Sequence, residues 1–372
     1  MKLSYLALLL VLILVGCNSD DLEQSGRTEP QLTDLTVIGE DLGNVYRYNY
    51  RAETGTGVLL NLSEEYQLPP NFLTLRQDGE LLTFFSVGNG YFSALQLEVG
   101  GNSPRYLQNF YPITGERSVT WGTASASQVF MAYYSPRGSK NLFVQILDLA
   151  AEVQADLSIA FNIREAYDPI YRENRLLVPY LGTDGIYKLA VIDTRQGILL
   201  QQLDLGTGVP SIFLEESGNI ALVRRTLEND YNLEVYDFNS IQLLEEYSFN
   251  VNRFFEPGPL QASMVAGRMF YTHFYAQPAA VPFAPAIYDF TGGGNTILDM
   301  PSIENAVSAE LMQDLRLTFV NYLPGSKMFA VGYYEDRQEP EVRGGILLIS
   351  EAGELLERIT FPFAPSFIME RN

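Results

Sequence analysis

Apolar residues recur along most of the chain in short runs that end at Gly, Asn, Asp or Pro. The runs alternate apolar with polar positions or are rich in Val, Ile, Leu, Tyr and Phe, which is the pattern of β-strands. They come in pairs around a short acidic or small-residue turn, as in a β-hairpin. Such hairpins are predicted at 142–161, 187–205, 232–249, 286–300 and 345–361, with weaker ones at 45–66 and 92–110.

A second predicted hairpin precedes most of these segments, so that each unit has four antiparallel strands, A to D in chain order. These preceding hairpins are 70–87, 119–134, 168–181, 209–225, 259–275 and 315–334. Turn positions of the units recur every 44 to 61 residues, at Asn49, Glu98, Asp148, Asp193, Asp237, Asp289 and Ser350. Repeated four-stranded units are typical of a β-propeller, in which each unit is one blade. We therefore predict an all-β propeller of seven blades, with a β-sandwich or a β-helix as the alternative.

The ends of the repeat must meet, because a single blade is too small to bury both of its faces. Two apolar runs, 35–39 and 366–369, are each able to supply a closing strand, and the pattern does not choose between them. Only 302–314 is predicted as a helix, inserted between blades. No linker-like change in composition occurs after residue 35, so we predict one propeller domain over 34–372.

The first residues follow a different pattern. Lys2 precedes a continuous apolar run, Leu6 to Val15, that is short for a membrane span. The run ends in Leu14-Val15-Gly16-Cys17, which resembles a bacterial lipobox. This resemblance implies that 1–16 is a lipoprotein signal peptide and that the thiol of Cys17 carries the lipid. An ordinary secretory signal that ends near a cysteine is the alternative.

Residues 17–33 are rich in Asp, Glu, Gln, Ser and Gly, and we predict a flexible acidic tether there. Within it, Ser19-Asp20-Asp21-Leu22-Glu23 resembles the export signal of surface lipoproteins in Bacteroidetes-type bacteria. The resemblance implies lipid anchoring in the outer membrane, on the cell surface. It also implies a partner, because such lipoproteins often accompany TonB-dependent transporters. A merely solvated tether is the alternative interpretation.

Composition excludes several classes of function. The chain has 24 Lys and Arg against 45 Asp and Glu, and a net charge of −21 argues against sequence-independent nucleic-acid binding. A single Cys excludes intramolecular disulfides and cysteine zinc sites, and a single His excludes multi-histidine metal sites. The Gly292-Gly293-Gly294 run lacks the lysine and helix of a phosphate-binding loop. We therefore predict no cofactor and no metal.

Catalytic groups are not singled out by any motif. His273 has no accompanying G-x-S-x-G serine, so we interpret it as a packed strand residue. The recurrent aspartates Asp148, Asp193, Asp237 and Asp289 hold equivalent positions in different units, and we interpret them as turn formers. Carboxylates are nevertheless abundant, so a glycoside hydrolase or lyase with an Asp/Glu pair stays open as an alternative.

In a propeller, the loops between strands B and C and the D–A connections emerge on one face, here called the B–C face. The A–B and C–D turns emerge on the opposite A–B face. The B–C loops 135–140, 226–231, 276–285 and 335–344 are long and rich in aromatic and Arg residues, which suit sugars, aromatic chelates or peptides. Inter-blade packing is the alternative role for each residue. The candidate ligand-binding residues are Tyr134, Arg137, Arg224, Phe255, Tyr275, Tyr334 and Arg337.

From the sequence we therefore expect a lipid-anchored binding module at the outer membrane, whose partner is a transporter, a glycan or a chelate. A propeller glycoside hydrolase or lyase is one alternative. A scaffold of the cell envelope without a small ligand is the other.

Overall fold

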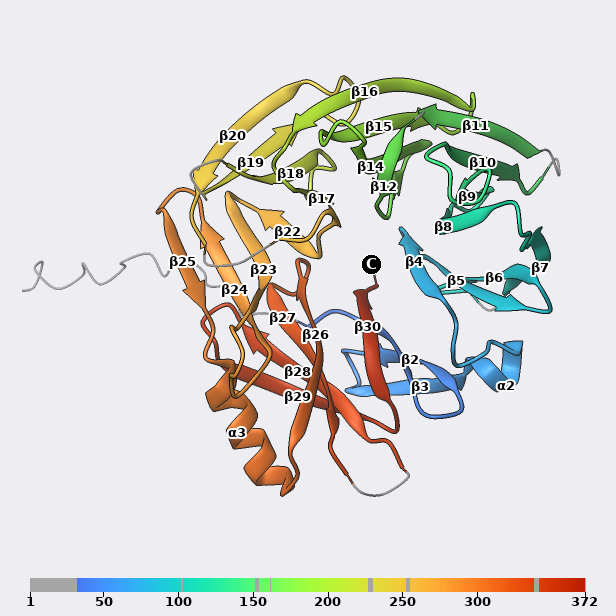
Figure 1. The fold of residues 1–372 in the computed structure, drawn as a ribbon. Helices are drawn as coiled ribbons and strands as arrows, with labels where there is room; N and C mark the ends of the chain where they lie inside the picture. The colour runs from blue at the N-terminus through green and yellow to red at the C-terminus, as the bar shows by residue number, and fades with distance from the viewer. Residues whose placement is uncertain are drawn as a thin grey trace, which may run out of the picture.

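The computed structural model describes residues 32–101, 103–150, 154–160, 162–226, 230–251, 255–337 and 341–371. The predicted signal peptide, Cys17 and almost all of the predicted tether lie outside these residues. The described residues form seven sheets, in which the strands of each blade run antiparallel, arranged in a ring (Figure 1). The predicted seven-bladed β-propeller is thereby confirmed.

In each blade, the first strand named lies nearest the centre of the ring and the last lies at its outer edge. Blade 1 comprises β30 (Ala364–Glu370), β1 (Leu35–Glu40), β2 (Val45–Arg51) and β3 (Thr56–Asn61). Blade 2 comprises β4 (Thr74–Asp78), β5 (Leu81–Gly88), β6 (Tyr91–Glu98) and β7 (Arg105–Pro112). Blade 3 comprises β8 (Ser118–Ala124), β9 (Gln128–Tyr134), β10 (Leu142–Asp148) and β11 (Gln154–Ala160).

Blade 4 has its inner strand in two parts, β12 (Ile163–Ala166) and β13 (Ile170–Arg172), followed by β14 (Arg175–Gly182), β15 (Tyr187–Asp193) and β16 (Ile198–Gly206). Blade 5 comprises β17 (Pro210–Leu214), β18 (Ile220–Arg225), β19 (Tyr231–Tyr236) and β20 (Leu243–Phe249). Blade 6 comprises β22 (Ala262–Val265), β23 (Arg268–Phe274), β24 (Phe283–Asp289) and β25 (Gly294–Ile297). Blade 7 comprises β26 (Leu315–Leu323), β27 (Met328–Glu335), β28 (Gly344–Ser350) and β29 (Leu355–Phe361).

The ring closes within blade 1, where the two terminal runs are neighbouring strands. The C-terminal β30 is the innermost strand and pairs antiparallel with β1. Both runs left open by the sequence pattern are therefore used, one as strand A and the other as strand B. The carboxylate of Glu370, the last residue of β30, stabilises this closure. It accepts hydrogen bonds from the backbone of Gly325 and Ser326 in blade 7, at 2.8 and 2.7 Å, and from the hydroxyl of Thr33, which precedes β1, at 2.9 Å.

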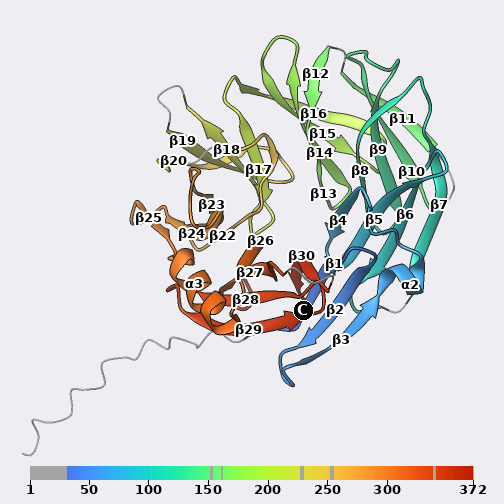
Figure 2. The same cartoon turned by 60° about the horizontal axis from the view of Figure 1, so that its bottom comes forward.

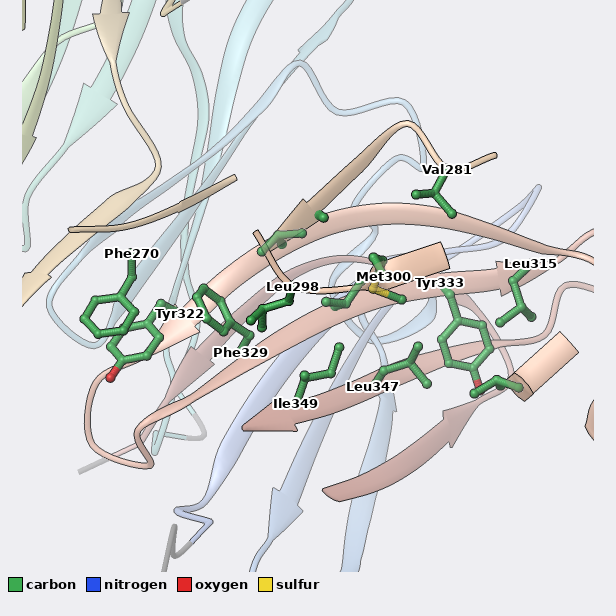
Figure 3. Close-up of a cluster of buried hydrophobic side chains, with 14 of the residues drawn as sticks. Phe270, Val281, Leu298, Met300, Leu315, Tyr322, Phe329, Tyr333, Leu347 and Ile349 are labelled. Carbon is green, nitrogen blue, oxygen red and sulfur yellow. The ribbon is translucent and has the colours of Figure 1, made fainter. Parts of the chain in front are cut away.

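Apolar side chains from adjacent blades interlock to form the core. Figure 3 shows one such cluster between blades 6 and 7, where the rings of Phe270 and Tyr322 stack with centroids 3.6 Å apart. The helix α3 (Met300–Leu311), which connects these blades, contributes the buried Met300 and Val307 to the same cluster. Because neighbouring blades bury each other's faces, no blade has a complete core of its own.

Three local predictions need correction. The segment after Thr56 is a strand only to Asn61, because the Asn61 side chain accepts hydrogen bonds from the backbone of Ser63 and Glu64 and starts the short helix α2 (Leu62–Tyr66). Asn49 lies inside β2, opposite Val58, and the C–D turn of blade 1 follows only after Arg51. The helix predicted at 302–314 begins two residues earlier, because Asp299 caps it, and ends at Leu311.

The recurrent aspartates act as turn formers, as predicted. Asp193 accepts hydrogen bonds from the backbone of Arg195 and Gln196, both at 2.9 Å. Asp237 and Asp289 cap their C–D turns in the same way. The Ser240 hydroxyl together with the backbone bonds lowers the pKa of Asp237, and the backbone bonds lower the pKa of Asp289. In the part of the chain that the structure describes, no helix is long and apolar enough to cross a membrane.

Candidate functional site

A cavity of about 840 Å³ lies on the B–C face where blades 7 and 1 meet. Its walls are the β1–β2 loop (41–44), Glu335 at the end of β27, Arg337 and residues 341–344 after it, the end of β29 and Leu311 of α3. The volume falls in the range of about 300–1,000 Å³ that is usual for small-molecule sites. The rim is apolar at Leu42, whose side chain is 85% exposed.

Two arginines contribute charge to this cavity. Arg337 binds through its Nε to the carboxylate of Glu335, which is 8% exposed and lies at the end of β27. Arg343 lies 3.5 Å from the exposed carboxylate of Glu341. The cavity therefore presents two guanidinium groups beside apolar surface, a combination that binds carboxylates, phosphates or the polar face of a sugar or peptide.

The Asp41 carboxylate holds the β1–β2 loop in shape. Its Oδ1 accepts the backbone N–H groups of Gly43 and Asn44, each at 2.7 Å, and its Oδ2 accepts the Tyr46 hydroxyl at 2.7 Å. Burial alone raises the pKa of Asp41, but these hydrogen bonds outweigh it and leave the pKa below its usual value. Burial together with the bond to Asp41 raises the pKa of Tyr46 to about 12. Asp41 is thus an ionised structural group and is poorly suited to donate a proton.

The seven residues predicted to bind a ligand are spread around the ring, and only Arg337 lines this cavity. On blade 3, Tyr134 is half-buried against the inter-blade core, and its hydroxyl accepts a hydrogen bond from the Ala166 backbone. Arg137 is exposed in the β9–β10 loop. Tyr334, at the end of β27, is 36% exposed on the B–C face.

The other three residues are engaged by the protein itself. Arg224 pairs with the buried carboxylate of Glu234 and also donates to the Leu205 carbonyl at 2.8 Å. Phe255 is 2% exposed and lies edge-on to the ring of Tyr231 in the core of blades 5 and 6. Tyr275 is half-buried, meets the ring of the buried His273 edge-on, and has its pKa raised by burial. In this structure, all three contribute to packing or to ion pairing within the fold.

The β1–β2 loop and Arg343 line the cavity but were not among the binding residues predicted from the sequence. The loop was missed because 35–39 had not been assigned to strand B of a blade. With that assignment, 41–44 is a B–C loop by position, since it follows the second strand of blade 1. Arg343 lies within the long loop 335–344 that the sequence did identify, but nothing distinguished it from the neighbouring charged residues.

A second cavity, of about 690 Å³, lies in the central channel toward the A–B face. The short strand β21 (Gly258–Pro259) pairs in parallel with β17, and its Pro259 lines this cavity. Arg76 connects three blades on the wall of this cavity. From blade 2, it donates a hydrogen bond to the Gly122 carbonyl of blade 3 at 3.3 Å and forms an ion pair with Asp168 of blade 4 at 2.8 Å. Asp78 and Glu173 both line the cavity, and burial raises the pKa of the Asp78 carboxyl. Among the described residues, no group of His, Cys, Asp or Glu is arranged to hold a metal ion.

Comparisons with known proteins support the fold. No protein-family model matches the chain, and no curated protein sequence matches it. Among solved structures, a putative 6-phosphogluconolactonase from Bacteroides uniformis is similar, with a TM-score of 0.51 and 14% identity over 90% of this chain and 98% of that one. The propeller domain of Cps50 (Swd1) from Myceliophteria thermophila has a TM-score of 0.49 and 14% identity over 82% of this chain and 91% of that one. At 14% identity, the likeness to the Bacteroides uniformis structure shows the overall fold alone.

Proposed function

We propose that the protein is a lipid-anchored binding module of the outer membrane, exposed on the cell surface and serving a TonB-dependent uptake system. The signal-like segment, the Cys17 position and the acidic tether support the anchor and the location. The propeller supports the binding role, because it offers a rigid ring of loops on which a ligand or partner site is built. Oligosaccharides, peptides and aromatic iron chelates are the ligand classes that this reasoning favours.

The observation that carries the binding role is the cavity between blades 7 and 1. It combines a small-molecule volume with two guanidinium groups and an exposed apolar rim at Leu42. Each of its carboxylates has a partner: Asp41 holds its own loop, Glu335 pairs with Arg337, and Glu341 lies beside Arg343. Among the described residues that line the cavity, this arrangement is suited to holding a ligand and offers no unengaged acid for catalysis.

The test is a binding screen with three probes: maltoheptaose, a tryptic digest of casein, and ferric tris-catecholate. Leu42→Ser and Arg343→Ala are the pocket variants. Leu244→Ser is the matched control, because Leu244 is 53% exposed at the start of β20, on blade 5. At least one probe is expected to bind, with about tenfold or greater loss in the pocket variants and none in the control. If no probe binds, or if the three variants behave alike, the cavity is not the site.

A second candidate function rests on the channel cavity. Asp78 and Glu173 both line it, burial raises the pKa of the Asp78 carboxyl, and Glu173 pairs with Arg172 at 3.2 Å. A glycosidase needs one carboxyl with a raised pKa and a second that is ionised, within one cleft. The test is hydrolysis of a panel of p-nitrophenyl glycosides by the wild type and by Asp78→Asn. Turnover that Asp78→Asn abolishes would favour the enzyme. Turnover equal to buffer in both proteins would remove this candidate.

A further inference from the structure

The two ends of the described chain meet on the A–B face. The backbone N–H of Thr33 donates to the Ser326 hydroxyl at 3.1 Å, and Ser326 lies in the A–B turn of blade 7, between β26 and β27. Next to it, the backbone N–H of Arg371 donates to the Asp34 carbonyl at 2.8 Å, and the Arg371 guanidinium pairs with the Asp34 carboxylate at 2.9 Å. The chain therefore enters the propeller from the A–B face, at a fixed point.

This entry point lies close to the channel and away from the outer rim. β1 is the second strand from the inside of blade 1, and its neighbour β30 is the innermost. Figure 1 shows the C-terminus beside the centre of the ring, and Figure 2 shows it again next to β1 and β30. The cavity of the proposed function is lined by B–C loops, on the opposite face.

The tether is short compared with the propeller. Thr33 is sixteen positions after Cys17, and a flexible tether of that length, as the sequence predicts for 17–33, has a root-mean-square span of about 20–24 Å. To present the B–C face to the bilayer, the tether must pass two more strands outward, about 10 Å, and then run about 23 Å along a seven-residue strand such as β2. That path of about 33 Å exceeds the mean span, whereas the opposite orientation needs no detour.

We infer that the anchored protein turns its A–B face to the bilayer and presents the B–C cavity away from the membrane. The inference rests on the proposed lipid anchor at Cys17. It adds to the proposed function the side from which the ligand enters the cavity, which is the medium and not the membrane.

Two matched cysteine variants test the orientation. Ala352 lies in the C–D turn of blade 7, on the A–B face, and Ala280 lies in the B–C loop of the adjacent blade 6; both are exposed. Since lipidated Cys17 has no free thiol, Ala352→Cys and Ala280→Cys each create a single site for a donor fluorophore. The labelled lipoproteins are reconstituted in neutral phosphatidylcholine vesicles that contain a rhodamine-labelled lipid as acceptor.

Energy transfer from position 352 is expected to be at least twice that from position 280. Equal transfer, or stronger transfer from position 280, would overturn the orientation. A protein that does not associate with the vesicles would instead contradict the lipid anchor. In that case the same variants, held on nickel-chelating lipid by a histidine tag placed before residue 18, still test the orientation, with the same expected and contradicting results.

Discussion

Removing residues 364–372 is expected to unfold the whole propeller, because β30 closes the ring. The deletion takes away Ile368 and Met369, which are 2% and 6% exposed, and burial of each such side chain contributes about 1.5–3 kcal/mol. It also removes the Glu370 carboxylate, whose backbone donors at Gly325 and Ser326 lose a charged partner, at about 1.5–3 kcal/mol for each hydrogen bond. The total, about 6 kcal/mol or more, is comparable with the whole stability of an ordinary domain, about 5–15 kcal/mol.

The assay is urea unfolding followed by circular dichroism, on a graded series of variants. Ser366→Ala changes an exposed residue of β30 and is expected to cost about 0.5 kcal/mol or less. Ile368→Ala removes a buried side chain of the same strand and is expected to cost about 2–5 kcal/mol. The deletion itself is expected to show no cooperative transition, and a synthetic peptide of residues 362–372 is expected to restore one. A deletion variant with a sharp transition at an unchanged midpoint would refute closure by β30.

Three further predictions address the anchor, the tyrosines and the channel. Cys17→Ser is expected to fold but to lose membrane association, and incorporation of labelled palmitate at the wild-type level would contradict this. Tyr134→Ala is expected to lower stability in thermal unfolding by about 2 kcal/mol, because the ring of Tyr134 packs between blades 3 and 4. Tyr334 is more exposed, so Tyr334→Ala is expected to change stability by about 0.5 kcal/mol or less. Equal effects of the two substitutions would contradict the difference in burial. Burial raises the pKa of Asp78 above its usual 3.8, so wild-type stability is lost as pH rises from 3.8 through the folded-state pKa. Asp78→Asn is therefore expected to be more stable than wild type at pH 7, with a difference that shrinks as pH falls through the folded-state pKa toward 3.8. A variant that is less stable than wild type at pH 7 would contradict this.

Most strands were predictable because their signals are local. Alternating apolar positions and turn residues such as Asp193 and Asp237 lie within a few residues of the hairpins that they define. The partner of a strand is not a local property, so the pattern at 35–39 and 366–369 did not show that these runs pair with each other. The helix α2 did carry a local signal, since Asn61 is followed three residues later by Glu64, but the apolar run before it continued the strand pattern.

The candidate site was less predictable than the fold because it depends on burial and pairing between distant residues. Phe255 follows a loop in the sequence, yet its ring is enclosed by side chains of blades 5 and 6. Arg224 is bound to Glu234, ten residues away on the neighbouring strand, and composition does not reveal such a pair. The cavity on the B–C face joins residues near 42 with residues near 343, and only ring closure brings these segments together.

The most direct test of the binding role is a crystal structure of the chain from residue 17, carrying Cys17→Ser, with the probe that binds best among maltoheptaose, casein peptides and ferric tris-catecholate. We predict that the probe lies between the 41–44 loop and Arg343, against Leu42, on the B–C face. Density for the probe in the channel beside Asp78, or at the outer strands, would contradict the account.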